Sequence, residues 1–196
     1  MMWYNNSTGT RTIQLATSSD HAPKGQAWLH EIKFDGYRLV AHIEHGRVRL
    51  MTRNGLDWTG RLPAQARQLR VLPVEQAILD GELVALGEGG ISSFRELQEA
   101  LSRKQSGELI YQLFDLIYLD GYDLSTAALI ERKKALAQLL AAAGYERDGV
   151  LRYTDHLQGQ GLEFFEQACA LGLEGSMAKR ASAPYHSGRS RQWLKV

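Results

Sequence analysis

The sequence contains very little cysteine and no long apolar run. Its single cysteine, Cys169, cannot close a disulfide within the chain, which favours a reducing compartment such as the cytoplasm. No stretch approaches the ~18 apolar residues of a membrane-spanning helix, and the longest apolar patch, Leu136 to Ala143, is interrupted by Gln138. The polar start of the chain lacks the apolar core of a secretion signal. These absences predict a cytoplasmic protein without a membrane partner.

What is present indicates one ordinary folded domain. The chain has 196 residues, of which 44% are hydrophobic and 23% charged. Asn, Ser, Thr and Gly dominate residues 1–26, where Pro23 and Gly25 would break any helix, so we expect a loose N-terminal lead-in there. Residues 27–196 are then expected to form the domain, as a monomer.

The net charge of +1 conceals two basic segments separated by an acidic one. Residues 47–70 contain six arginines and one acid, and residues 179–195 contain five basic residues and no acid. Residues 75–131 contain eleven acids against three basic residues. This pattern predicts a face that binds a polyanion. The alternative is a set of solvated charges without a ligand.

The periodicity predicts an α+β fold with largely antiparallel sheets flanked by helices. Helices and strands mix without a regular βαβ alternation, which argues against a parallel sheet. The predicted strands are 28–34, 38–44, 47–53, 78–86, 109–119, 150–153, 176–180 and 192–196. The predicted helices run from Ser92 or Ser93 to 104, from 125 to 143 and from 162 to 171. In the last helix Cys169 lies one turn from Phe165, so we expect it in the core.

The most informative stretch is the hexapeptide from Lys33 to Arg38, Lys-Phe-Asp-Gly-Tyr-Arg. It places a lysine at the end of an apolar-alternating strand, followed by an Asp-Gly turn. Because side chains alternate along a strand, Glu31 and Lys33 share one face. A lysine held in this way can act as a nucleophile. The alternative is a surface lysine that pairs with Glu31.

Four further elements follow in order. Asp80 and Glu82 project to one side of an apolar strand, where carboxylates need a partner: a metal ion, a ribose hydroxyl, a basic residue or a strand-end salt bridge. Phe114 either stacks on a base or belongs to the core, as most aromatic residues in apolar strands do. Glu174, next to Gly175, offers a hard oxygen ligand to Mg²⁺. Lys195 lies in the last predicted strand.

These elements resemble, in order, the motifs of the ATP-dependent DNA ligases, whose superfamily also contains RNA ligases and mRNA-capping enzymes. The run from Trp28 to Arg38 is most similar to the ligase module of bacterial non-homologous end-joining ligases. The later motifs are matched by Thr52-Arg53-Asn54-Gly55, Asp80-Gly81-Glu82, Phe114-Asp115, the run 174–179 and Trp193-Leu194-Lys195. The resemblance covers residues 28–196.

The resemblance implies a role for each residue. Lys33 would attack the α-phosphate of ATP and form a lysyl-AMP. The nucleotide would be bound by Glu31 at the adenine amino group, Phe114 on the base, Glu82 and Arg38 at the ribose, and Lys179 and Lys195 at the phosphates. Glu82 and Glu174 would hold Mg²⁺ or Mn²⁺. Arg53 and Arg38 would contact nicked double-stranded DNA.

The resemblance implies an ATP-grasp-like nucleotidyltransferase fold that passes AMP to the 5′-phosphate of a nick during DNA repair. The sequence contains neither the second lysine that usually follows Lys195 by two positions nor an oligonucleotide-binding barrel. It therefore predicts the adenylation domain alone, aided by a barrel or an end-joining partner in trans, with partial reactions in its absence. The alternatives are a non-catalytic nick-binding fragment and an RNA ligase or capping-type nucleotidyltransferase.

Nucleophilic attack requires a neutral lysine amine, although the ordinary pKa of lysine is about 10.4. Positive charge nearby lowers that pKa. We therefore expect Lys195, Arg38 and a metal ion to lower the pKa of Lys33 and to stabilise the pyrophosphate leaving group.

Overall fold

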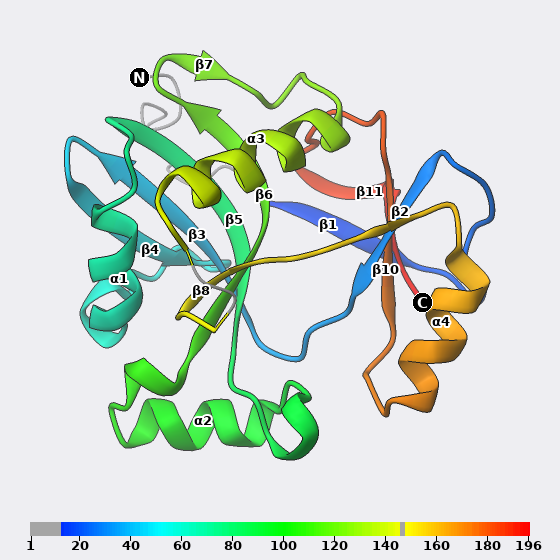
Figure 1. Ribbon diagram of the computed structural model, residues 1–196, viewed down its shortest axis with the longest axis horizontal. Helices are drawn as coiled ribbons and strands as arrows, with labels where there is room; N and C mark the ends of the chain where they lie inside the picture. Colours follow the sequence, from blue (N-terminus) through cyan, green and yellow to red (C-terminus); the bar gives the residue numbers. More distant parts are fainter. Residues whose placement is uncertain (1–12, 146–147) are drawn as a thin grey trace.

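A computed structural model describes residues 13–145 and 148–196, which fold into two open β-sheets with helices around them (Figure 1). The first sheet has the order β1-β11-β10-β2-β9, and the second has the order β4-β3-β5-β6-β7, with β8 pairing with β6. The strands are β1 (Gln14–Ser18), β2 (Trp28–Ile32), β3 (Tyr37–Glu44), β4 (Arg47–Thr52), β5 (Gln76–Val84), β6 (Ile110–Leu119), β7 (Tyr122–Asp123), β8 (Leu151–Tyr153), β9 (Leu157–Gln158), β10 (Ser176–Arg180) and β11 (Gly188–Lys195).

The antiparallel α+β fold predicted from the sequence is confirmed. Most strand pairs are antiparallel, and the two parallel pairs are β1 with β11 and β6 with β8. The hairpin of β3 and β4 turns at Gly46, where a φ of 75° favours glycine. β2 belongs to the first sheet and ends at Ile32, and β3 belongs to the second sheet and begins at Tyr37. The Lys33–Gly36 segment therefore crosses from one sheet to the other.

In the part of the chain that the structure describes, four α-helices cover the sheets: α1 (Pro63–Arg70), α2 (Phe94–Ser102), α3 (Leu129–Ala142) and α4 (Gly161–Ala170). Short 3₁₀ turns lie at η1 (Thr59–Arg61), η2 (Glu88–Gly90) and η3 (Ser106–Glu108). The predicted cap of α2 is confirmed, because the Ser93 side chain accepts a hydrogen bond from the Glu96 amide. The predicted start of α3 at Ser125 is wrong, because the helix begins at Leu129. Residues 124–128 form a turn, in which the Ser125 amide donates to Asp123 Oδ1 at 2.9 Å.

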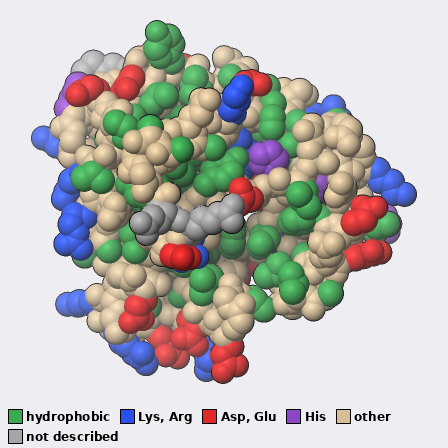
Figure 2. Space-filling model, in the orientation of Figure 1, with side chains coloured by type: hydrophobic (Ala, Val, Ile, Leu, Met, Phe, Trp, Pro, Cys, Tyr) green, Lys and Arg blue, Asp and Glu red, His purple; other side chains and the backbone are tan. Residues whose placement is uncertain are grey.

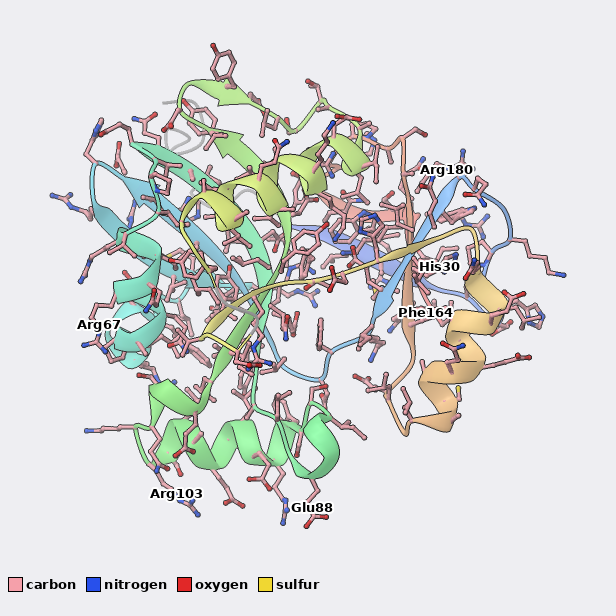
Figure 3. All side chains as sticks on the ribbon, in the orientation of Figure 1. His30, Arg67, Glu88, Arg103, Phe164 and Arg180 are labelled. Carbon is pink, nitrogen blue, oxygen red and sulfur yellow. The ribbon has the colours of Figure 1, made fainter. Side chains whose placement is uncertain are left out.

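The main core lies in the second sheet and beneath α1, α2 and α3. It contains Leu39, Leu79, Leu113 and Leu136, all with 0% exposure. In Figure 1, α3 runs across β5 and β6, and α4 lies beside β2 and β10. On the α4 side, His30 and Phe164 point toward one another, with ring centroids 6.3 Å apart (Figure 3). Each sheet thus has its own helical cover.

α3 joins the two sheets at its N-terminal end. The amides of Leu129 and Ile130 donate to the carbonyls of Ala183 and Ala181, in the segment that follows β10. Further along, α3 packs against β6 of the second sheet. The first turn of α3 is consequently fastened to one sheet, while its apolar face covers the other.

Two sequence expectations are wrong. The lead-in 1–26 contains a strand, β1, which forms an edge of the first sheet and pairs in parallel with β11; residues 1–12 lie outside the described part of the chain. Cys169 is exposed rather than buried. The packed side of α4 is formed by Gly161 and Ala168, and the neighbouring position 169 turns outward.

Charge is spread over several surfaces of the molecule. Arg67 on α1 and Arg180 at the end of β10 lie on opposite sides of the view in Figure 3. Acidic and basic side chains mix over the α2 region, as Figure 2 shows. The two basic segments therefore do not merge into one patch on this face. Among the described residues, none of the helices has the length and apolar character that crossing a membrane requires.

Candidate functional site

Lys33 lies where the two sheets meet, directly after β2. Its amide donates to the Gly175 carbonyl at 3.2 Å, which ties the segment to the start of β10. Its Nζ forms an ion pair with Glu174, and its side chain is 23% exposed. Burial lowers the pKa of Lys33, and Lys195 lowers it further, while Asp35 and Glu82 oppose this. The amine is thus reachable from solvent and has more of its neutral form than an ordinary lysine.

The turn after Lys33 is fixed by α2. The amide of Asp35 donates to Ser92 Oγ at 3.1 Å, and its carboxylate accepts from the Phe94 amide at 3.3 Å. A Cβ at Gly36 would lie 2.2 Å from the Leu83 carbonyl oxygen, so only glycine fits between the turn and β5. Lys33 is therefore held from both sides, by β10 before the turn and by α2 after it.

Arg38 and Asp80 form a two-pronged ion pair. Arg38 Nε lies 2.5 Å from Asp80 Oδ1, and Nη2 lies 2.6 Å from Oδ2. The Tyr185 hydroxyl donates to the same Oδ2 at 2.7 Å. Asp80 is 0% exposed and Arg38 is 17% exposed at its side chain. Burial alone would lower the pKa of Arg38, but Asp80 outweighs it and the pKa is raised. Of the partners considered for Asp80, the basic residue is confirmed.

This pair changes one electrostatic expectation. We expected Arg38 to lower the pKa of Lys33, but the charge of Arg38 is matched by Asp80 at contact distance. Burial and Lys195 are the causes that lower the pKa of Lys33. Burial was missed because the sequence does not show how deep a strand end lies in the fold.

Glu82 occupies the middle of a row across three strands of the second sheet. It pairs in register with Arg38 on β3 and with Gln112 on β6. Burial raises the pKa of Glu82 to about 7; Asp80 and Asp35 add to the rise, while Arg38 and Lys33 oppose it. Glu82 is thus a carboxyl group whose charge depends on the ions around it.

Glu31 is buried between two lysines. Lys179 Nζ lies 2.5 Å from its Oε2, and Lys133 Nζ lies 2.7 Å from its Oε1. The exposed fractions are 1% for Glu31, 2% for Lys179 and 0% for Lys133. Burial would raise the pKa of Glu31, but the two lysines outweigh it and the pKa is lowered. The alternative pairing of Glu31 with Lys33 is not the one formed in the structure.

Lys179 also contacts the predicted base-stacking residue. Its Nζ lies 4.0 Å from the ring centroid of Phe114 and 4.3 Å from that of Trp193. Burial lowers the pKa of Lys179 to about 8, with Glu31 opposing and Lys133 reinforcing the shift. Phe114 is 5% exposed, so in this structure its ring is covered. The structure brings together Lys33, Glu174 and Glu82 in one group, and Glu31, Lys179 and Phe114 in another.

The remaining predicted residues lie at the surface. Lys195 is exposed at the end of β11, opposite Met177 on β10. Arg53 is exposed in the turn that follows β4. A cavity of about 730 Å³ opens beside the site, and its wall includes Ile32 and Phe34, which flank Lys33, as well as Gln112 and His156.

Sequence reasoning missed Lys133, although a signal was available. The buried residues of α3 include Leu129, Lys133, Leu136 and Leu140, which follow a helical period along one face. Two cations, Arg132 and Lys133, therefore occupy the core side of this helix. Arg132 pairs with Asp115 at 2.7 Å, and both side chains are 0% exposed. A charge in an apolar helical stripe indicates a buried partner.

The carboxylates fit a divalent cation that is shared with a substrate. The described residues contain no cluster of three or more histidine, cysteine or acidic side chains that could enclose a metal by themselves. Mg²⁺ commonly takes one or two carboxylates together with substrate phosphates. Glu174 contacts Lys33, and Glu82 influences its pKa, so both acids are close to the amine.

The segment that carries Lys33 joins the two sheets, and Glu82 and Glu174 lie close to its amine. This arrangement defines a nucleotidyltransferase-type domain. Residues 13–196 match the family described as the ATP dependent DNA ligase domain. The chain therefore belongs to the ATP-dependent DNA ligase family.

Relatives and solved structures agree with this assignment. The chain is 43% identical over 183 residues to the multifunctional non-homologous end joining protein LigD of Pseudomonas aeruginosa, covering 93% of this chain and 21% of that protein. It resembles the crystal structure of the ligase domain from M. tuberculosis LigD, with a TM-score of 0.80, 35% identity and coverage of 94% of this chain and 59% of the other. A mycobacterial DNA ligase D complexed with ATP and MES gives a TM-score of 0.78 at 35% identity, with the same coverage of both chains. The chain thus spans about a fifth of the length of this LigD relative.

Proposed function

We propose that this chain is the adenylating part of an ATP-dependent DNA ligase that acts in end joining, and that Lys33 carries AMP covalently. The observation that carries the proposal is the position of Lys33, a partly exposed amine with a lowered pKa beside Glu174 and Glu82. The family membership of residues 13–196 supports the same chemistry. The likeness to a ligase D that was solved with ATP supports ATP as the nucleotide.

In the proposed first step, the neutral Nζ of Lys33 attacks the α-phosphorus of ATP. A bond forms between nitrogen and phosphorus, the bond from that phosphorus to the bridging oxygen breaks, pyrophosphate leaves, and the amine gives up a proton to solvent. The lowered pKa of Lys33 increases the fraction of amine that is competent to attack. Lys195 and Lys179 would contact phosphate oxygens and favour departure of pyrophosphate.

Other residues would bind and orient the nucleotide. Glu31 would accept the adenine amino group, Phe114 would stack on the base, and Glu82 and Arg38 would lie at the ribose. Glu82 and Glu174 would hold a divalent cation, Mg²⁺ or Mn²⁺, which supplies positive charge against the triphosphate. Lys179 and Arg38 both contact the Phe114 ring, so a base that stacks in the place of the lysine requires Lys179 to move from the ring.

In the following steps AMP would pass to the 5′-phosphate of a DNA nick, which the 3′-hydroxyl then attacks. Contacts to phosphates are independent of base sequence, as sealing of any nick requires. Arg53 is proposed for such a contact because it is exposed at the β4 turn. Arg38 would reach the nick only at the inner edge of the site, since its side chain is 17% exposed. A barrel domain or an end-joining partner would clamp the DNA in trans.

The test is intact mass spectrometry of the purified chain after incubation with ATP and a divalent cation. We expect an added mass that corresponds to one AMP, and none in Lys33→Ala. Lys24→Ala is the matched control, because Lys24 is an exposed lysine in the loop before β2. Labelling by GTP in place of ATP would favour a capping-type enzyme, and binding of nicks without any labelling would favour a non-catalytic fragment. Retained labelling in Lys33→Ala would refute the assignment of the nucleophile.

A further inference from the structure

Lys133 is a buried cation to which none of the sequence motifs assigns a role. Its Nζ lies 2.7 Å from Glu31 Oε1 and donates to the Thr154 carbonyl at 2.9 Å, and its side chain is 0% exposed. Its neighbours along the buried face of α3 are Leu129, Leu136 and Leu140. A buried lysine costs free energy that a leucine at this position would avoid. Its presence on this face therefore points to its partner, Glu31.

Glu31 is shared between lysines of two different elements. Lys133 comes from α3 and approaches Oε1, while Lys179 comes from β10 and approaches Oε2. With all three side chains at 2% exposure or less, one carboxylate and two ammonium groups carry a net charge of +1 in the interior. This excess of positive charge suits the arrival of an anion, and Lys179 is the lysine next to the aromatic rings.

Binding of a nucleotide would separate Lys179 from Glu31 and Lys133. The Phe114 ring is contacted by Lys179 Nζ at 4.0 Å and by the Arg38 guanidinium at 4.3 Å, so a base that takes the place of the lysine on this ring must displace its amine, which would then be free to reach the phosphates. Glu31 would then lose the partner at Oε2. A buried carboxylate left without a cation is strongly destabilised. The ion pair at Oε1 compensates Glu31 in that state.

We propose that Lys133 is a positioning residue for nucleotide binding, which holds the Glu31 carboxylate in place and compensates its charge when Lys179 leaves for the nucleotide phosphates. The inference rests on the proposed adenylation, because it uses the assignments of Phe114 and Lys179. Lys133 itself touches no reacting atom; it acts through Glu31. An arginine could supply the same cation on the same helix face, whereas a methionine fills the space without charge.

The charged groups around the cluster come from several elements. Lys133 faces Glu31 and Tyr153, whose ring centroid lies 4.7 Å from its Nζ, and Asp115 also raises its pKa. Lys179 faces Glu31, Lys133 and Arg38. Burial lowers the pKa of His156; Lys133 and Lys179 add to this shift, while Glu31 and Asp155 oppose it. Substitution of Lys133 therefore has its first effect on Glu31 and Lys179, the two groups in this cluster that are assigned to the nucleotide.

The test compares Lys133→Met and Lys133→Arg in the full 196-residue chain, with Lys134→Met as the matched control. Lys134 is the adjacent residue of α3 and is exposed. We expect Lys133→Met to raise the KM for ATP in self-adenylation at least about tenfold, with a smaller change in kcat. Lys133→Arg should restore the KM to within about threefold, and Lys134→Met should leave it unchanged. Thermal unfolding of each variant identifies those that fail to fold.

A second measurement separates action through Glu31 from a general effect on stability. If Lys133 acts through Glu31, the loss in ATP affinity of Glu31→Gln should not deepen when Lys133→Met is added. Losses that add fully, or an unchanged KM in a folded Lys133→Met chain, would overturn the inference alone. A parent chain that neither binds ATP nor gains AMP would overturn the proposed function, and the inference with it.

Discussion

Lys33 and Gly175 are joined by a backbone hydrogen bond of 3.2 Å from the amide of the first to the carbonyl of the second. This bond brings the candidate nucleophile beside Glu174, the residue before Gly175. Gly175 has a φ of 145°, and a Cβ there would lie 2.2 Å from the Val196 carbonyl oxygen. The alignment of the two segments therefore depends on glycine at this position.

The first prediction concerns Gly175→Ala. A side chain would strain the backbone and push against Val196, so we expect a loss of stability of about 1–3 kcal/mol or more and a strong loss of AMP labelling. Gly107→Ala is the control, because a Cβ at Gly107 meets nothing within 4 Å. Chemical denaturation and intact mass measure the two effects. Equal stability of the two variants would contradict the proposed alignment.

The second prediction concerns the Arg38–Asp80 pair. Asp80→Ala would leave the Arg38 guanidinium without its buried partner, so we expect a destabilisation of about 3–5 kcal/mol. Glu99→Ala provides the comparison, because it breaks an exposed ion pair between Glu99 on α2 and Arg103 just after it, and it should cost less than about 1 kcal/mol. Urea unfolding curves at pH 7 give both values. A difference of less than about 1 kcal/mol between the variants would show that the buried pair is not important for stability.

The third prediction follows from the pKa of Glu82, about 7 in the folded chain against an ordinary value of 4.5. Between these values the folded state keeps a proton that the unfolded state releases, so this group lowers the free energy of unfolding as pH rises. Glu82→Gln removes that dependence. We expect its stability relative to the parent to increase from pH 4.5 to pH 7.5 by on the order of 1–3 kcal/mol.

Unfolding without nucleotide at several pH values measures this difference directly. Glu99→Gln is the matched control, since Glu99 is an exposed glutamate on α2, and its difference from the parent should stay flat with pH. A flat curve for Glu82→Gln as well would contradict the raised pKa.

The fourth prediction concerns Arg53 and DNA. If Arg53 contacts a phosphate, Arg53→Ala should weaken binding to nicked duplexes of any sequence and reduce the slope of log affinity against log salt by about 1. Arg103→Ala, just after α2, removes a surface arginine that already pairs with Glu99, and its slope should equal that of the parent. Fluorescence anisotropy over a range of salt concentrations gives the slopes. An unchanged slope for Arg53→Ala would remove this residue from the DNA contacts.

Local patterns were sufficient to predict most strands and helices of this fold. The alternation in β2 and β3 and the glycine that ends α3 act within a few residues, so the sequence displays them. β1 was missed because its partner, β11, is more than 170 residues away and no local signal announces that pairing. α1 received no prediction because it is short, although Pro63 at its first position is a signal for the start of a helix.

The site likewise combines local features that the sequence displays with contacts between distant segments that it does not display. Lys33, Asp35 and Gly36 belong to one local turn, and their arrangement could be read from the sequence. The sharing of Glu31 by Lys133 and Lys179 could not, because it depends on how α3 and β10 pack against β2. Likewise the sequence shows that Asp80 needs a partner but does not show that Tyr185 joins Arg38 there.

The pair of backbone hydrogen bonds that holds Val196 against β10 has a practical consequence. Its amide and carbonyl both bond to Ser176, at 2.9 and 3.1 Å, and its carbonyl faces Gly175, which neighbours Lys33. A fluorescent group attached just beyond Val196 would therefore begin within a few side-chain lengths of the reactive amine. Such a reporter should respond to occupation of the nucleotide site without any change to the residues that form it.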